Sequence, residues 1–167
     1  MNNQRIWAPW RAEYILDESK NDSCVFCKVT NSTNNDDNKR LLVLKRGSFS
    51  FVIMNKYPYN PGHLMVVPYK HATYFDDLSS EIISEMIQLK IRSINALRNA
   101  MNPEGFNIGI NIGQAAGAGV KDHLHIHIVP RWNGDTNFMP VLSSSRVISE
   151  ALNVTYDKLF NEFRSIQ

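Results

Sequence analysis

Residues 122–130 restrict the fold most strongly, because histidine and aliphatic side chains alternate along them. Every second position is a histidine: His123, His125 and His127. The positions between them are aliphatic: Leu124, Ile126 and Ile128. On an extended strand this alternation sends the two kinds of side chain to opposite faces. We therefore expect a β-strand with its aliphatic side in the core and three histidines on one polar surface.

Three histidines at this spacing, in a chain with 5 histidines in all, indicate a reactive site. An imidazole is a competent nucleophile near neutral pH because its ordinary pKa, about 6.5, leaves much of it unprotonated. Attack on phosphorus would give a phosphoramidate that water or another acceptor resolves. The candidate nucleophile is His125, which has a like group on each side. The alternatives are three ordinary histidines, or a metal site built from the row. The metal site is weaker, since side chains on a flat strand point nearly parallel and stand about 6.6 Å apart or more.

Composition excludes several classes of protein. The chain of 167 residues is 43% hydrophobic and 20% charged, which suits one globular domain with a real core. The 18 basic and 16 acidic residues are spread along the chain, and a net charge of +2 does not fit a nucleic-acid-binding protein. No apolar run approaches the roughly 20 residues that cross a bilayer, and the start lacks a signal peptide. We expect a cytoplasmic protein that does not bind membranes.

The two cysteines, Cys24 and Cys27, are three residues apart. They are too few for a disulfide scaffold, and two thiolates at this spacing are common in zinc sites. A tetrahedral site would need two more ligands, for which His71 and His123 are the candidates. A redox pair and a pair of buried thiols remain as alternatives.

Apolar periodicity predicts an α+β fold. Runs typical of short strands separated by turn residues cover 41–44, 50–54, 64–67 and 106–112. A helix is expected after Ser79 as N-cap, ending at Asn102, with one apolar face: Ile83, Met86, Ile87, Ile94 and Leu97. A last helix is expected from about Ser149, with a face of Ile148, Leu152, Leu159 and Phe163. The short links between strands favour a mostly antiparallel sheet.

The period-two pattern of 106–112 predicts one buried face of apolar residues and puts Asn111 on the polar side. The loop 113–120 that follows is made mostly of small residues, with three glycines within seven positions. Glycines before a row of histidines suggest backbone N–H groups that meet an anion.

The stretch His123-Leu-His-Ile-His-Ile-Val resembles the defining motif of the histidine triad (HIT) superfamily. The upstream stretches Ser50–Asn55 and Pro61–Pro68, with His71, are also similar to that family. The segment 129–139 and the N-terminal Trp7-Ala-Pro-Trp-Arg resemble more narrowly the bacterial diadenosine tetraphosphate phosphorylases and ATP adenylyltransferases.

The resemblance implies a HIT fold, in which a five-stranded antiparallel sheet packs on one long helix, here with a C-terminal helix and an N-terminal arm. It also implies a homodimer with a continuous sheet and a nucleotide substrate. His125 matches the nucleophile that becomes nucleotidylated, and His127 a second catalytic histidine. The positions that match substrate contacts are Asn55, His63, Asn111, Gln114, Gly117, Ala118, Gly119 and Val120. Many relatives carry a polar Gln-Ser or Gln-Thr pair where this chain has Gly119-Val120.

Some relatives hold structural zinc with a Cys-x-x-Cys, a later histidine and the first histidine of the row. The matching residues are Cys24, Cys27, His71 and His123. This match leaves His125 free for chemistry, although other triad proteins dispense with the metal.

We expect one HIT domain over residues 1–167, with an arm at 1–23, a core at 24–140 and a C-terminal helix at 141–167. The expected activity is nucleotidyl transfer at the α-phosphate of adenosine polyphosphates, with phosphate or water as acceptor. The alternatives are a hydrolase of nucleoside phosphoramidates or adenylated amines, and a non-catalytic nucleotide-binding scaffold.

Overall fold

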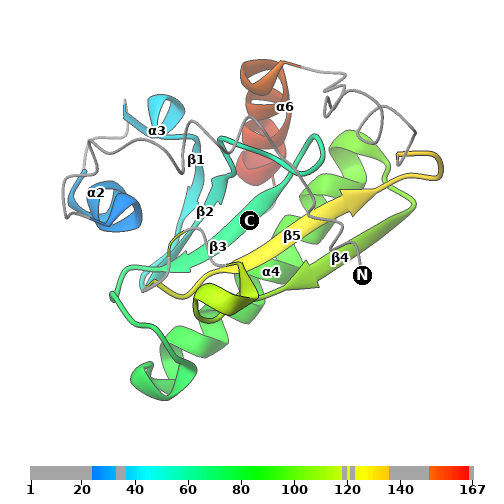
Figure 1. Cartoon of the computed structure of the whole chain (residues 1–167). Coiled ribbons are helices and arrows are strands. Elements are labelled where there is room, and N and C mark those ends of the chain that lie inside the picture. Colours follow the sequence, from blue (N-terminus) through cyan, green and yellow to red (C-terminus); the bar gives the residue numbers. More distant parts are fainter. Residues whose placement is uncertain (1–23, 33–36, 118–119, 121–122, 136–150, 166–167) are drawn as a thin grey trace, which may run out of the picture.

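A single antiparallel sheet organises the computed structural model, which describes residues 24–32, 37–117, 120, 123–135 and 151–165 (Figure 1). Its five strands follow the order β1-β2-β3-β5-β4. The strands are β1 (Val43–Arg46), β2 (Ser50–Met54), β3 (Leu64–Pro68), β4 (Gly105–Gly109) and β5 (Ile126–Arg131). Every neighbouring pair is antiparallel. The predicted α+β fold is confirmed.

Helices cover both faces of this sheet. The helices are α2 (Val25–Asn31), α3 (Asp37–Arg40), α4 (Ser80–Met101) and α6 (Leu152–Ser165), with 3-10 turns η1 (Phe75–Asp77) and η2 (Gln114–Ala116). In Figure 1, α4 crosses behind the strands and α6 lies beside it. None of the helices in the described ranges is long and apolar enough to span a membrane.

Alternation along the central strands builds two cores. In β2, Val52 and Met54 join the core under α4 and α6, while Phe51 and Ile53 join a second core under α2. β3 divides its side chains in the same way, and all residues of β2 and β3 are buried. Both faces are therefore covered at the centre of the sheet. The face under α2 is the one toward which the odd-numbered residues of β5, including His127, project.

The long helix follows the predicted bounds. Ser79 is its N-cap residue, and Asn102 ends it in the left-handed conformation, with φ 46°. The fully buried positions are Met86, Leu89, Ser93, Ala96 and Leu97. Ile83 and Ile94 pack against this core, but Ile87 is 39% exposed, so its assignment to the buried face was wrong. The fully buried positions include Leu89, Ser93 and Ala96, which the predicted face did not contain.

The first strand begins two residues later than predicted. Leu42 has φ 61°, a left-handed conformation that no strand residue adopts, and the chain enters β1 only at Val43. The second strand has the predicted bounds, and the third is one residue longer.

The edge strand β4 departs most from expectation. It ends at Gly109, before the predicted end at residue 112. Phe106 and Ile110 pack against the core, whereas Ile108 is 46% and Ile112 39% exposed. The alternation therefore does not mark a buried face over its whole length, because β4 lies at the edge of the sheet and its outer side has no neighbouring strand in the described part of the chain.

The C-terminal helix packs as its apolar spacing predicts. Leu159 and Phe163 are buried and Leu152 is packed against the core, while Ile148 lies outside the described residues. The hydroxyl of Tyr156 donates a hydrogen bond to the carbonyl of Val43 at 2.9 Å, which ties α6 to β1. The single domain over 1–167 stays a prediction, because its arm and the segment 136–150 are not among the described residues.

Candidate active site and metal centre

The histidine row keeps its predicted alternation but not its predicted backbone. β5 begins only at Ile126, so His123 and His125 precede the strand. The segment is fixed instead by a hydrogen bond from the Leu124 N–H to the carbonyl of Ala72 at 2.7 Å. The aliphatic residues of the row are buried in the core under α4, as expected.

The expectation of a polar surface was wrong for two of the three histidines. His123 is 1% and His125 is 3% exposed, and only His127 is partly open. The cause is α2, whose Phe26 ring lies over them. Its centroid is 5.3 Å from that of His123 and 5.1 Å from that of His125.

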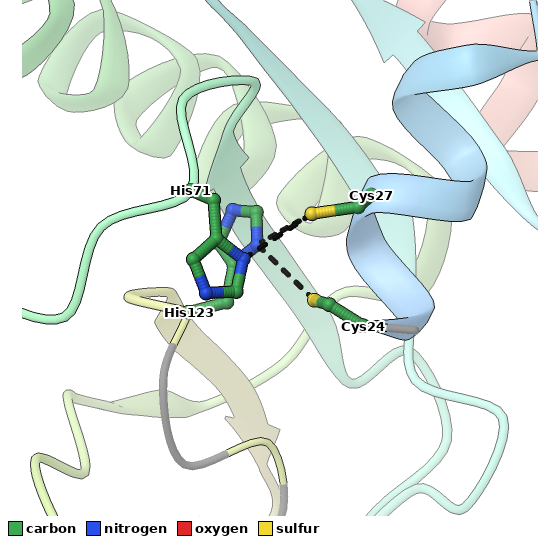
Figure 2. A group of neighbouring side chains, drawn as sticks. All are labelled: Cys24, Cys27, His71 and His123. Atoms are coloured by element: carbon green, nitrogen blue, oxygen red, sulfur yellow. Dashed lines mark hydrogen bonds between the residues drawn. The ribbon is translucent and has the colours of Figure 1, made fainter. Parts of the chain in front are cut away.

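Cys24, Cys27, His71 and His123 converge at one end of the row (Figure 2). The Nδ1 atom of His123 lies 3.3 Å from Cys24 Sγ and 3.7 Å from Cys27 Sγ, and Cys27 Sγ lies 3.2 Å from Nδ1 of His71. All four ligand atoms are within 4.8 Å of one another. The residues come from α2, the loop after β3 and the start of the row, so the fold gathers the proposed zinc ligands.

The donor set fits a tetrahedral metal ion. Zinc ligands at 2.0 to 2.3 Å from one ion stand roughly 3.3 to 3.8 Å apart at tetrahedral angles, close to the three separations above. The Nε2–H of His123 donates to the carbonyl of Pro68 at 2.9 Å, so its Nδ1 carries the lone pair that faces the thiols. Burial, and then Cys24, raise the pKa of Cys27. A bound cation would reverse this, because coordination deprotonates a thiol.

The His125 ring is oriented by a hydrogen bond to the main chain two residues earlier. Its Nδ1–H donates to the carbonyl of His123 at 2.8 Å. A carbonyl can only accept, so the lone pair of the neutral ring is on Nε2. Burial lowers the pKa of His125, while the hydrogen bond to His123 acts in the opposite direction. The ring is therefore a neutral base with one available nitrogen, which is the form that a nucleophile needs.

His127 has a different partner. The Tyr59 N–H donates to Nδ1 of His63 at 3.2 Å, so His63 carries its proton on Nε2. That Nε2 lies 2.9 Å from Nδ1 of His127 and donates to it. In neutral His127 the remaining proton is then on Nε2, where it can be donated to a ligand. The Tyr59 ring stacks on His63 with centroids 4.8 Å apart and holds the relay in place.

A cavity of about 310 Å³ opens beside the two histidines. His125 and His127 line it together with Asn55 and Val120, which were predicted substrate contacts. Its apolar wall is formed by Phe26, Val29, Leu42 and Ile53. The amide oxygen of Asn55 accepts from the Tyr57 N–H at 2.9 Å, which leaves its NH₂ group for a ligand.

The other predicted contacts are distributed differently. Asn111 lines a separate cavity that shares His127 with the first. Gly117 is described, with φ 78°, and the backbone of Gln114 begins η2. Ala118, Gly119 and the side chain of Gln114 lie outside the described part, as do Trp7 and Trp10.

The sequence reasoning missed Phe26, Tyr59 and Asn60. Phe26 stands between the two cysteines, and that position was a usable signal once a metal site was considered. Tyr59 acts through its backbone N–H, which no residue type reveals. Asn60 is 5% exposed and donates to the carbonyl of Pro130 at 3.0 Å and to Asp135 at 2.7 Å, contacts about 70 residues away in sequence.

Comparison with known proteins identifies the family. Residues 37–134 match the HIT domain model, and the chain belongs to the HIT domain family. It is 36% identical to a protein of Mycobacterium tuberculosis named AP-4-A phosphorylase, over 96% of this chain and 84% of that protein. It is 30% identical to an adenosine 5′-monophosphoramidase of Schizosaccharomyces pombe, over 66% of this chain and 76% of that protein.

Solved structures agree with this assignment. A Zn-bound histidine triad family protein from Mycobacterium smegmatis superposes with a TM-score of 0.67 at 26% identity, covering 86% of this chain and 95% of that one. A hypothetical histidine triad nucleotide-binding protein from Sulfolobus tokodaii gives a TM-score of 0.62 at 26% identity, over 85% of this chain and 90% of that chain.

Proposed function

We propose that this protein transfers the adenylyl group of an adenosine polyphosphate, such as diadenosine tetraphosphate, to phosphate or water through His125. One observation carries the proposal. The hydrogen bond from His125 Nδ1 to the carbonyl of His123 leaves the lone pair on Nε2, in a ring that lines a cavity of nucleotide size. No separate base is needed, because the attacking nitrogen is already unprotonated.

The reaction has two displacements. Nε2 of His125 attacks the α-phosphorus, an N–P bond forms, and the bond to the bridging oxygen breaks with its electron pair on the leaving group. For diadenosine tetraphosphate that group is ATP. His127, with its proton on Nε2, donates a hydrogen bond to the departing oxygen. An oxygen of phosphate or water then attacks the same phosphorus, the N–P bond breaks with its electron pair returning to Nε2 of His125, the proton of the acceptor passes to solvent, and ADP or AMP leaves.

The first cavity suits the nucleoside half of the substrate. Its apolar wall, built from Phe26, Val29 and Ile53 among others, buries a flat base without requiring matched hydrogen-bond partners. The NH₂ group of Asn55 can donate to a ribose hydroxyl, since the oxygen of that amide is already used. Val120 lines the same cavity, and its backbone N–H is the group of this loop proposed to donate to the phosphate.

The relatives support adenosine phosphates as the substrate class. The protein named AP-4-A phosphorylase is similar over nearly the whole chain, which favours phosphate as acceptor. The similarity to an adenosine 5′-monophosphoramidase favours the second candidate, hydrolysis of a phosphoramidate by the same nucleophile. A scaffold that only binds nucleotide would need no oriented histidine relay.

The Cys/His cluster is proposed to hold structural zinc, consistent with its spacing and with the zinc-bound relative. Zinc would supply a fixed tetrahedral link between α2 and the row, and so fix the cavity wall that α2 provides. Free thiols at Cys24 and Cys27 fit a reducing compartment, and we propose a cytoplasmic location.

A second copy of this chain is proposed to pair along β4. In the described part of the chain this strand is an edge of the sheet, and Ile108 within it and Ile112 just after it are exposed where a monomer would place polar residues. Light scattering should give the mass of two chains, and Ile108→Lys should shift it toward one. A monomeric mass for the wild type would contradict the pairing.

Incubation with diadenosine tetraphosphate, with and without inorganic phosphate, tests the activity. ADP plus ATP that appear only with phosphate indicate phosphorolysis, and AMP plus ATP without it indicate hydrolysis. His125→Ala should abolish both while it retains AMP binding. Lys28→Ala, an exposed position on α2, is the matched control. Full turnover by His125→Ala would refute the proposal.

A further inference from the structure

Two tight turns meet at one end of the sheet. Residues 60–63 lead into β3, and residues 132–135 follow β5; in each turn the N–H of the last residue donates to the carbonyl of the first at 3.1 Å. The third residue of each turn is a glycine with positive φ, 78° at Gly62 and 77° at Gly134, at the position where a type II turn requires it. Each turn is therefore fixed by its own backbone, and a side-chain contact joins the two.

This contact is centred on the carboxylate of Asp135. Its Oδ2 accepts from Nδ2 of Asn60 at 2.7 Å and from Nε of Arg131 at 2.6 Å, and its Oδ1 accepts from Nη2 of Arg131 at 2.7 Å. The Trp132 N–H also donates to Oδ2, at 3.2 Å. The NH₂ group of Asn60 donates a second time, to the carbonyl of Pro130 at 3.0 Å. Hydrogen bonds to a charged acceptor are stronger than neutral ones, so the Asn60 side chain is held firmly to the end of β5.

Asn60 directly follows the residue that sets the tautomer of a histidine pair. The Tyr59 N–H donates to Nδ1 of His63 at 3.2 Å, and the Nε2–H of His63 donates to Nδ1 of His127 at 2.9 Å. The first of these bonds is at the long end of the usual range, so a small displacement of the loop would break it. The anchor of Asn60 therefore controls whether the Tyr59 N–H reaches His63.

We infer that Asp135 is a positioning residue for the reaction. Its carboxylate fixes Asn60 and thereby the Tyr59 N–H, which keeps the proton of His63 on Nε2. The inference rests on the proposed function, in which the Nε2–H of His127 donates to the departing oxygen. Without the Tyr59 N–H, His63 can carry its proton on Nδ1 and accept at Nε2 from Nδ1 of His127. His127 then presents a lone pair at Nε2, where the reaction needs a donor.

Asn60→Ala tests this inference in the ligand-free enzyme. Alanine removes both amide hydrogen bonds and fits the backbone, since Asn60 has no positive φ. Nitrogen NMR on protein with isotopically labelled histidines identifies the protonated nitrogen of each ring. The proton of His127 should be on Nε2 in the wild type and mostly on Nδ1 in the variant. Because the Nε2–H form is the active one, kcat for diadenosine tetraphosphate should fall by the same factor, about fivefold for one lost hydrogen bond.

The tautomer separates this role from a direct contact with substrate. Asn60 also lines the cavity beside His127 that includes Asn111. If Asn60 acted by touching the substrate, or by packing alone, its loss would change KM, kcat or the unfolding temperature. Neither of these roles would move the proton of His127 in the free enzyme.

Asn99→Ala is the matched control. The Asn99 amide donates to the carboxylate of Glu162 at 3.1 Å, and this residue of α4 does not line the cavities beside His127. The tautomer of His127 and the kcat of this variant should equal those of the wild type. Asp135→Asn is a second test if Asn60→Ala folds poorly. It keeps the size of the side chain and one accepting oxygen, so the tautomer should shift in the same direction but less.

Two outcomes would overturn the inference. One is an unchanged His127 tautomer in both Asn60→Ala and Asp135→Asn, whatever their kcat. The other is a shifted tautomer with the kcat of the wild type, because the position of the proton would then not matter to the reaction. Failure of the wild type to become adenylylated would refute the proposed function, and with it the role in the reaction. A tautomer shift in the free variants would still demonstrate that Asp135 positions His127.

Discussion

His123 and His127 are four residues apart in the same row, yet their Nδ1 atoms have different partners. Nδ1 of His123 faces Cys24 at 3.3 Å, and Nδ1 of His127 faces His63 at 2.9 Å. The first ring presents a lone pair to thiols, while the second accepts a hydrogen bond at Nδ1 and keeps its own proton on Nε2. One residue type at one spacing thus gives a candidate metal ligand at one end and a hydrogen-bond donor at the other. The partner of each ring, and not the motif, determines its chemistry.

His125 lies between these two ends, and its removal should have the largest effect. His125→Ala deletes the nitrogen that forms the covalent bond, so kcat should fall by at least about a thousandfold. Steady-state turnover of diadenosine tetraphosphate measures this loss. Zinc content and unfolding temperature should stay near wild type, because neither end of the row is altered.

A substitution in the Cys/His cluster should lower the stability of the protein more than its catalytic rate. Cys27→Ser removes one of the proposed thiolate ligands, and structural zinc contributes directly to folding. We expect zinc content to fall from about one ion per chain to well below half, and the unfolding temperature to drop by about 5 °C or more. Metal analysis and thermal unfolding measure both. A variant that keeps its zinc and its unfolding temperature would show that the cluster is only a pair of buried thiols.

A substitution at the His127 end of the row should lower the catalytic rate more than the stability of the protein. His63→Leu removes the donor that orients His127, and kcat should fall about a hundredfold. His63→Gln can still accept from Tyr59 and donate to His127, so most of the activity should return. Equal losses in the Leu and Gln variants would mean that His63 serves packing alone.

The smallest effect is expected at His71, the exposed member of the cluster. Water can replace an exposed ligand more easily than a buried one, so His71→Asn should weaken zinc binding by roughly 2 kcal/mol, about thirtyfold. A competition titration with a chelator measures the affinity. If His71→Asn loses as much zinc affinity as Cys27→Ser, the difference in burial between the two residues does not determine how much each contributes to zinc binding.

Local patterns in the sequence predicted much of the fold. The bounds of α4 follow from Ser79 and Asn102, and the bounds of β2 from its apolar run. The row's aliphatic face is predicted by period-two spacing and is confirmed. These features depend on residues that are close in sequence, so a single amino-acid sequence is enough to predict them.

What the sequence could not reveal depends on distant contacts. The exposed Ile108 reflects the position of β4 at an edge, which only the strand order determines. The burial of His125 depends on Phe26, 99 residues earlier, and the tautomer of His127 depends on a backbone N–H of Tyr59. Spacing and the family resemblance predicted the four residues of the Cys/His set. Which ring nitrogens face the thiols follows only from the three-dimensional structure.

Mass spectrometry of the reacted protein tests the central claim most directly. Wild type is mixed with diadenosine tetraphosphate without phosphate, quenched without acid because the N–P bond is acid-labile, and digested. The account predicts one AMP on the peptide that contains His125, its absence in His125→Ala, and its release as ADP when phosphate is added before the quench. AMP on a different residue, or rapid turnover in phosphate with no adduct at any time, would contradict it.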